Sequence, residues 1–173
     1  MLKNTINVIA VVCLVTLGLF IYHTYFTTKV VYIDIPVVFN KFEMKKELQE
    51  KYKGVEAGRK RIIDSLGFSL QLLANKLKEN KTNKGLMYEF DTRREEFFKR
   101  KNQMQEDNVA LSTQYDKQIL EQMTQYIIEY GKKNNYDVIM GADGTGTLMY
   151  ANSKLDKSEE IIVFINKKYK GIE

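Results

Sequence analysis

The sequence predicts an α+β fold in which a small β-body carries a long antiparallel helical-hairpin arm, preceded by an N-terminal membrane helix. The stretch from Phe39 to Tyr136 has no proline, few glycines and apolar residues at helical spacing, which indicates long helices. A strand-like run stands just before this stretch, and a strand-turn-strand pattern follows it. The N-terminal end is a separate, largely apolar segment.

That apolar segment covers residues 6–26 and follows Lys3. Its most apolar part, residues 8–22, is short for a membrane helix and has the length of a signal-peptide core. The bulky residues 22–26 do not provide the small side chains that signal cleavage needs. We therefore favour an uncleaved signal anchor in residues 1–29 over a cleaved signal peptide, and either one exports the rest of the chain.

The β-body is expected from residues 30–42 and 123–173. Residues 30–35 are apolar on both faces, as in a buried strand, and Pro36 ends that strand and can begin a helix. Residues 136–140 predict a second strand, and the Asp-Gly pair within the glycine-rich residues 141–146 predicts a hairpin turn to a third strand at 147–150. Asp156, with Glu159 three residues later, predicts the capped start of a final helix.

The arm is expected over residues 43–122, with its tip near 80–85, where turn residues interrupt the apolar pattern. The first helix, of about 37 residues, would be about 55 Å long. Gly54, Gly58 and Gly67 lower its helix propensity, and they either let the arm flex or merely weaken it. Four polar residues occupy positions of the apolar stripes: Arg59, Arg93, Lys101 and Asn108.

Three short strands and one helix bury too little surface for an independent core. Exposed strand edges would also invite pairing with other chains. We therefore expect the body to be completed by oligomerisation. The residues expected at this interface are Val31, Ile33, Val138, Met140, Leu148 and Tyr150.

The residue content argues against an enzyme. The single histidine, His23, lies in the apolar N-terminal segment, and no nucleophile-histidine arrangement is present. The single cysteine, Cys13, lies there too, so no cysteine-based metal site is expected. The glycines of 141–146 lack the Lys-Ser/Thr pair of a phosphate-binding loop. We predict no catalytic residue, no metal and no cofactor.

Charge is high, at 28% of residues, with a formal net charge of +5. Such a surface is either a solvated helix face or an attraction to acidic partners. Nucleic acid is not an expected partner, because acidic residues are interleaved along both arm helices and the chain is exported.

Between residues 30 and 169 the chain resembles the Skp/OmpH family of periplasmic chaperones. The motifs that carry the resemblance are Val-Tyr-Ile-Asp at 31–34, Val-Phe-Asn at 38–40, Lys-Asn-Asn-Tyr-Asp-Val-Ile at 133–139, Leu-Met-Tyr-Ala at 148–151 and Leu-Asp at 155–156. The resemblance implies a homotrimer with a β-body and three helical arms that enclose a cavity. It also implies that the protein holds unfolded outer-membrane proteins, its clients, in the periplasm without ATP.

Client binding would need dispersed apolar contacts and charge near the arm tips. The candidate residues are Phe68, Leu72, Met87, Phe90, Phe97 and Phe98, together with the basic Arg93, Arg94, Lys99 and Arg100. For each of these apolar residues, packing between the two arm helices is the alternative role, and it is the favoured one for Phe90 and Phe97. The alternative function is that of a membrane-anchored coiled-coil scaffold of the cell envelope. We expect periplasmic localisation with an inner-membrane anchor at residues 6–26, or a soluble periplasmic protein if the signal is cleaved.

Overall fold

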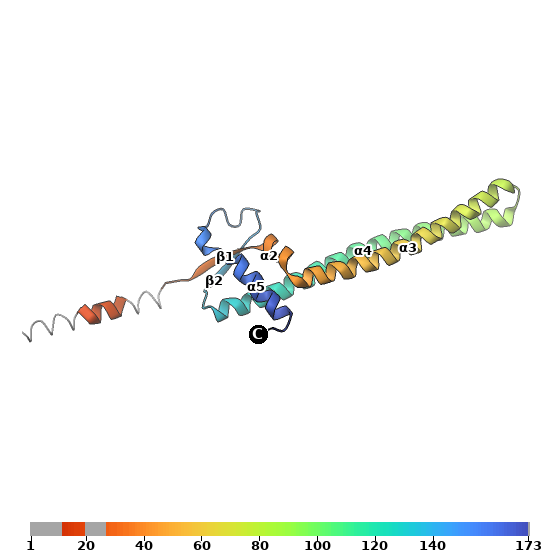
Figure 1. Cartoon of the computed structure of the whole chain (residues 1–173). Coiled ribbons are helices and arrows are strands. Elements are labelled where there is room, and N and C mark those ends of the chain that lie inside the picture. Colours follow the sequence, from red (N-terminus) through yellow and green to blue (C-terminus); the bar gives the residue numbers. More distant parts are fainter. Residues whose placement is uncertain (1–11, 20–26, 173) are drawn as a thin grey trace, which may run out of the picture.

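The computed structural model describes residues 12–19 and 27–172, which form a small body with a long two-helix arm (Figure 1). The order from residue 30 onward is β1 (Val30–Asp34), α2 (Ile35–Lys41), α3 (Glu43–Glu79), α4 (Lys84–Lys133), β2 (Val138–Ala142), the short 3-10 helix η1 (Ser153–Leu155) and α5 (Ser158–Tyr169). The described protein is therefore mostly helical, with a small sheet.

The arm consists of α3 and most of α4, which run antiparallel and side by side away from the body (Figure 1). Asn80 ends α3, and Asn83 begins α4 by accepting a hydrogen bond from the Leu86 backbone N–H at 3.0 Å. The turn between them uses the polar residues that predicted it. The helical-hairpin arm expected from the apolar spacing is confirmed.

Within the described residues the sheet has two strands, and they are parallel rather than joined by a hairpin. Val31 pairs with Ile139 and Ile33 with Gly141. The whole arm is therefore the crossover connection between β1 and β2. The prediction of a third strand at 147–150 is wrong, because this segment has no strand structure and leaves Tyr150 83% exposed. Among the described residues, this segment pairs with no strand and its apolar side chains do not cover the sheet.

The change from β1 to α2 occurs where the sequence places it. The Asp34 carboxylate accepts a hydrogen bond from the Val37 backbone N–H at 2.9 Å, and Pro36 lies in the first turn of the helix. Both features stabilise a helix start. A break between α2 and α3 was not expected. It occurs at Phe42, whose backbone is extended and whose side chain is fully buried.

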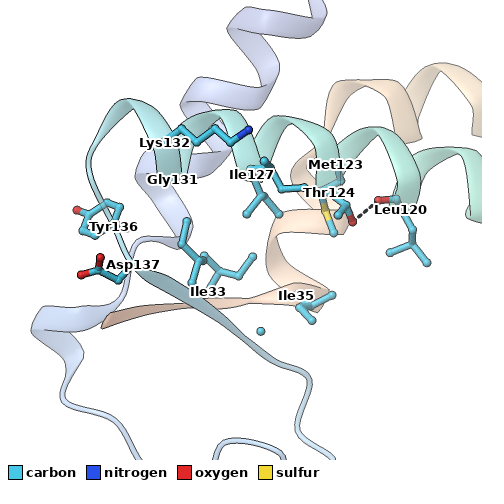
Figure 2. Close-up of a pocket in the computed structure, with 13 residues that line it drawn as sticks. Ile33, Ile35, Leu120, Met123, Thr124, Ile127, Gly131, Lys132, Tyr136 and Asp137 are labelled. Carbon is cyan, nitrogen blue, oxygen red and sulfur yellow. Dashed lines mark hydrogen bonds between the residues drawn. The ribbon is translucent and has the colours of Figure 1, made fainter. Parts of the chain in front are cut away.

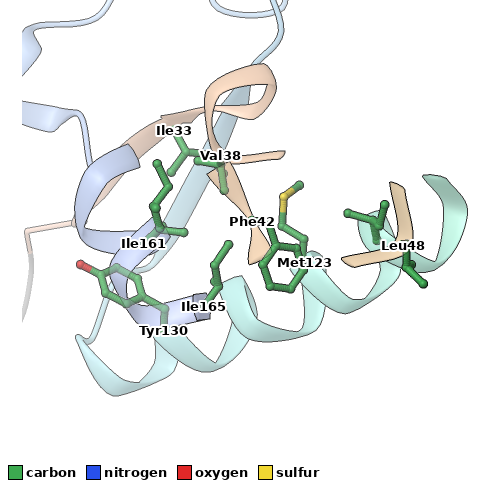
Figure 3. Close-up of a cluster of buried hydrophobic side chains, with 10 residues drawn as sticks. Ile33, Val38, Phe42, Leu48, Met123, Tyr130, Ile161 and Ile165 are labelled. Atoms are coloured by element: carbon green, nitrogen blue, oxygen red, sulfur yellow. The ribbon is translucent and has the colours of Figure 1, made fainter. Parts of the chain in front are cut away.

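The core of the body lies between α2, the end of α4 and α5 (Figure 3). The Phe42 ring makes edge-to-face contacts with the rings of Tyr126 and Tyr169, at centroid distances of 6.2 Å and 5.5 Å. Ile161 and Ile165 of α5 are completely buried beside it. Phe42 is therefore the point at which the arm is fixed to the body.

Polar contacts also fasten α5 to both arm helices. Lys168 forms an ion pair with Glu129 of α4 at 3.0 Å, and Lys170 with Glu43 of α3 at 3.5 Å. The Asn166 side chain accepts a hydrogen bond from the Glu43 backbone N–H and donates one to the Lys41 carbonyl, so it spans the break at Phe42.

The predicted capping of the last helix by Asp156 and Glu159 is wrong in its details. Asp156 accepts hydrogen bonds from the backbone N–H and the hydroxyl of Ser158, while Glu159 pairs with Lys41. The helix begins at Ser158, and the Lys157 backbone N–H before it donates to the Tyr32 carbonyl at 2.9 Å. This bond holds the start of α5 against the free side of β1.

Among residues 12–19 and 27–172, no helix has the length and apolar character needed to cross a membrane. Residues 12–19 are helical, with exposed apolar side chains. The rest of the predicted membrane segment at 6–26 lies outside the described residues.

Candidate functional site

The apolar candidates on the outer half of the arm fall into two groups. Phe68, Leu72, Met87 and Phe98 are 64%, 47%, 48% and 52% exposed. Phe90 and Phe97 are half-buried. A Cβ atom added at Gly67 would lie 3.4 Å from the Phe97 ring, so this ring packs across the arm onto α3. The four residues of the first group are exposed to solvent, and Phe97 packs between the two helices.

The basic candidates are partly neutralised by neighbours on the same helix. Arg93 pairs with Glu89 at 3.6 Å, Arg94 with Asp91 at 3.2 Å and Arg100 with Glu96 at 3.2 Å. Exposed pairs of this kind are weak and leave the positive charge accessible. Lys99 forms no ion pair within the described parts of the chain. Residues 68–101 contain nine basic and five acidic side chains, so the outer arm remains basic.

Halfway along the arm, a polar bond crosses between its two helices. Arg59 Nη1 of α3 donates a hydrogen bond to Asn108 Oδ1 of α4 at 2.5 Å, and both residues are half-buried. Beside this bond lies a groove of about 420 Å³. Its charged lining comprises Lys53, Glu56, Arg59, Lys60 and Lys101. The groove is therefore basic. The stripe pattern indicated Arg59, Lys101 and Asn108 but not the groove.

A second groove, of about 460 Å³, lies where α4 passes over the sheet (Figure 2). Ile127 and Leu120 point from α4 towards the strands, and Ile33 faces them from β1 (Figure 2). Leu120 and Ile128 remain 43% and 45% exposed at its edge. Sequence reasoning missed this groove. Its signal was that these two apolar residues lie outside the core-facing stripe of Ile119 and Met123.

The groove depends on two close backbone approaches. A Cβ atom at Gly141 would lie 2.3 Å from Ile35 Cδ1, and one at Gly131 would lie 3.2 Å from Ile139 Cδ1. These glycines allow β2 to pack closely against Ile35 and allow the end of α4 to lie on β2. The floor and one wall of the groove therefore require both glycines.

The residues expected at an oligomer interface differ in how far they are exposed. Val31 and Ile33 are buried within the chain itself, at 5% and 3% exposure. Val138 and Tyr150 are exposed, whereas Met140 and Leu148 are half-buried. The free side of β1 is bridged by Asp156, but the outer side of β2 carries no strand among the described residues.

Two tyrosines at the base of the arm have altered acidity. Burial and a 2.9 Å hydrogen bond to Glu160 raise the pKa of Tyr130, and the bonds from Lys157 and Tyr130 lower the pKa of Glu160. A hydrogen bond to Glu47, together with burial, raises the pKa of Tyr169 to about 12. Both tyrosines therefore stay protonated and join α5 to the arm helices.

No group of three or more His, Cys, Asp or Glu side chains suited to a metal ion occurs within 12–19 and 27–172.

Exposed apolar side chains, basic patches and a long arm together define a protein class that offers an extended binding surface.

Comparison with known proteins identifies the family. The model of the OmpH-like outer membrane protein family matches residues 29–164, so the chain belongs to this family. The fold is similar to the crystal structure of an OmpH-like protein from Caulobacter crescentus, with a TM-score of 0.72 and 11% sequence identity. That match covers 82% of this chain and 86% of the other. No curated protein sequence matches this chain significantly.

Proposed function

We propose that this protein is an ATP-independent periplasmic holdase that binds unfolded outer-membrane proteins between helical arms. One observation carries the proposal. The arm has exposed apolar side chains along its length, and few of its residues are buried. Promiscuous binding requires contacts that are dispersed and adaptable rather than one shaped pocket. Membership of the OmpH-like family supports the same function.

We further propose that the protein is a homotrimer with an interface at the sheet. A two-stranded sheet is marginal alone, and the outer side of β2 is available for pairing. The exposed Met149 and Tyr150 follow β2 and would be covered by a neighbouring copy. Val138, Met140 and Leu148 belong to the same proposed interface. Val31 and Ile33 are buried within the chain and hold β1 in place behind that interface.

The proposed location is the periplasm, with residues 6–26 acting as a signal anchor or as a cleaved signal. The exposed apolar residues of the described helix at 12–19 favour contact with lipid. In the anchored form, the arms would collect clients close to the inner membrane. In the cleaved form, the protein would diffuse.

The test uses residues 28–173 mixed with a urea-denatured outer-membrane β-barrel protein. The urea is diluted while light scattering is followed, and the mixture is sized by multi-angle scattering. Suppressed aggregation, with one client per trimer, is the expected result. Unchecked client aggregation beside an intact oligomer would reject the holdase and favour the envelope scaffold. A folded monomer at micromolar concentration would reject the trimer.

The basic outer arm provides a second measurement. Changing Arg93, Arg94, Lys99 and Arg100 to glutamine should weaken capture of acidic clients and reduce its dependence on salt. Glutamine retains the helix and avoids repulsion of Glu89 and Glu96. Capture that keeps its strength and salt dependence would remove electrostatic attraction from the proposal.

A further inference from the structure

One side of α4 carries a line of exposed apolar residues along almost the whole arm. Met87, Phe98, Val109 and Leu120 are 48%, 52%, 64% and 43% exposed, and each follows the previous one by eleven residues. Eleven residues make about three turns of an α-helix, so the four side chains lie on nearly the same side of α4. The line is about 50 Å long at 1.5 Å per residue.

The line joins both grooves described above. Leu120, at the inner end of the line, lines the groove where α4 passes over the sheet, called here the aliphatic groove. Val109 lines a shallow surface hollow that shares Gln105 with the basic groove beside Arg59. One flank of the arm therefore combines the apolar line, a basic groove and an aliphatic groove at its base.

Two exposed apolar residues of α3, Phe68 and Leu72, lie elsewhere. Phe68 follows Arg59 by nine residues, which is about two and a half turns, so it lies on the side of α3 opposite to the bond with Asn108. Leu72 follows four residues later and lies on nearly the same outer side. Phe68 and Val109 have the same exposure, 64%, but they face different directions.

The chemistry of the flank indicates its occupant. Successive apolar residues on the line are about 16 Å apart along the helix, whereas a helix-helix interface needs them every three or four residues. Polar residues separate them. In the basic groove, Lys60 and Lys101 have no ion-pair partner within the described residues. Such a surface suits an unfolded chain with scattered apolar and acidic side chains.

We propose that the flank bearing Met87, Phe98, Val109 and Leu120 is the client-contacting side of the arm. Its occupant is an unfolded polypeptide whose acidic groups lie near Lys60 and Lys101 and whose apolar segments reach the groove beside Leu120. Phe68 and Leu72, on the outer side of α3, take no part. This inference rests on the proposed holdase function and assigns it to one side of the arm.

The test places a photoreactive benzoylphenylalanine in the full chain, at one position per variant. The positions on the line are 87, 98, 109 and 120, and the control positions are 68 and 72. Each variant is produced in bacterial cells together with an epitope-tagged outer-membrane β-barrel protein, and irradiated. Adducts with the tagged client are expected at the four positions on the line. The yield of adduct at 68 and 72 should be at least about fivefold lower, because cross-linking needs direct contact.

Three outcomes would overturn the inference. Equal client adducts at 68 and 109 would show that capture is not restricted to one side, while leaving the holdase function intact. Adducts at 109 that join two copies of the chain instead of the client would assign this flank to self-association. No client adduct at any of the six positions would reject both the inference and the holdase function.

A matched pair of double variants provides a second readout that does not depend on the photoreactive group. F98Q/V109Q and F68Q/L72Q each remove two side chains of similar exposure. The amount of tagged client that co-purifies with the full chain should fall about tenfold for F98Q/V109Q, as for a loss of two partly buried apolar contacts. It should change less than about twofold for F68Q/L72Q. Equal losses in the two variants would overturn the inference.

Discussion

Arg59 and Asn108 face each other across the middle of the arm, with Arg59 Nη1 2.5 Å from Asn108 Oδ1. Both residues occupy positions that a purely apolar helical pair would fill with leucine or isoleucine. Because one bond can form only when these two residues are opposite each other, the pair fixes how α3 and α4 are aligned along their length.

Removing one partner of this bond should destabilise the arm. We expect Asn108→Leu to lower the free energy of unfolding by about 1–2 kcal/mol, because Arg59 loses a charge-assisted bond in a half-buried place. The double variant R59L/N108L should recover this loss. Thermal unfolding followed by circular dichroism measures both. Lys60→Leu, one residue from Arg59, is the control and should change little. A double variant as unstable as N108L would contradict the expectation.

Gly141→Ala should destabilise the body by about 1–3 kcal/mol, because the new methyl group overlaps the Ile35 side chain. The cost should be much smaller in an Ile35→Ala background, which removes both overlapping carbons. Denaturant unfolding of the four proteins of this cycle gives the coupling between the two sites. Additive effects of the two substitutions would show that the contact with Ile35 is not the cause.

Gly54→Ala and Gly58→Ala should each stabilise the arm, by about 0.5–1 kcal/mol, because nothing lies within 4 Å of the added carbon and alanine favours helix. Thermal unfolding measures the gain. Gly131→Ala is the control and should show no gain, since its added carbon lies 3.2 Å from Ile139. Client capture by the two stabilised variants then separates the alternatives for these glycines. Reduced capture indicates a need for flexibility, and unchanged capture indicates only low propensity.

The bond between Tyr169 and Glu47 should contribute stability that depends on pH. The folded pKa of Tyr169, about 12, is above its ordinary value of 10.0. Its contribution is therefore present below pH 10 and is lost as the pH rises towards 12. Bonding to Lys51 and Tyr169 lowers the pKa of Glu47 below 4.5, so the contribution also decreases as the pH falls through that carboxyl's folded pKa.

Replacing Tyr169 with phenylalanine tests this dependence. At pH 7 we expect the midpoint of thermal unfolding to fall by about 2–4 °C, as for the loss of one hydrogen bond in a chain of this size. The difference from the unsubstituted protein should disappear near pH 12. Tyr88→Phe is the matched control, because Tyr88 is 77% exposed. A difference that stays constant from pH 7 to 12 would show that only packing was lost.

The sequence allowed the arm to be predicted because its information is local. The spacing of residues such as Leu48 and Ile119 and the turn residues near Asn80 specify helices and their ends without reference to distant parts of the chain. The start of α2 at Asp34 and Pro36 is equally local. The same local signals failed at 141–150, where an Asp-Gly turn predicts a hairpin. Asp143 instead bonds to Thr145, and β2 pairs with β1, more than a hundred residues away.

The candidate site was only partly predictable, for a related reason. Exposed aromatic residues such as Phe98 can be identified from the positions that fall outside the apolar stripe. The basic groove at Lys60 and Lys101 requires the alignment of two helices, which Arg59 and Asn108 fix only in three dimensions. The groove beside Leu120 requires the sheet to pack under α4 through Gly131 and Gly141. Neither contact is encoded by spacing along one helix.

The two helices of the arm are attached to the body in different ways. α3 begins immediately after Phe42, where the chain turns, whereas α4 continues without a break from the tip to Lys133, over 50 residues. Met87 near the tip and Gly131 in the body groove thus belong to one rod about 75 Å long. Because α4 has no break between these two ends, a sideways force on the tip would be transmitted along this helix to the wall of the groove.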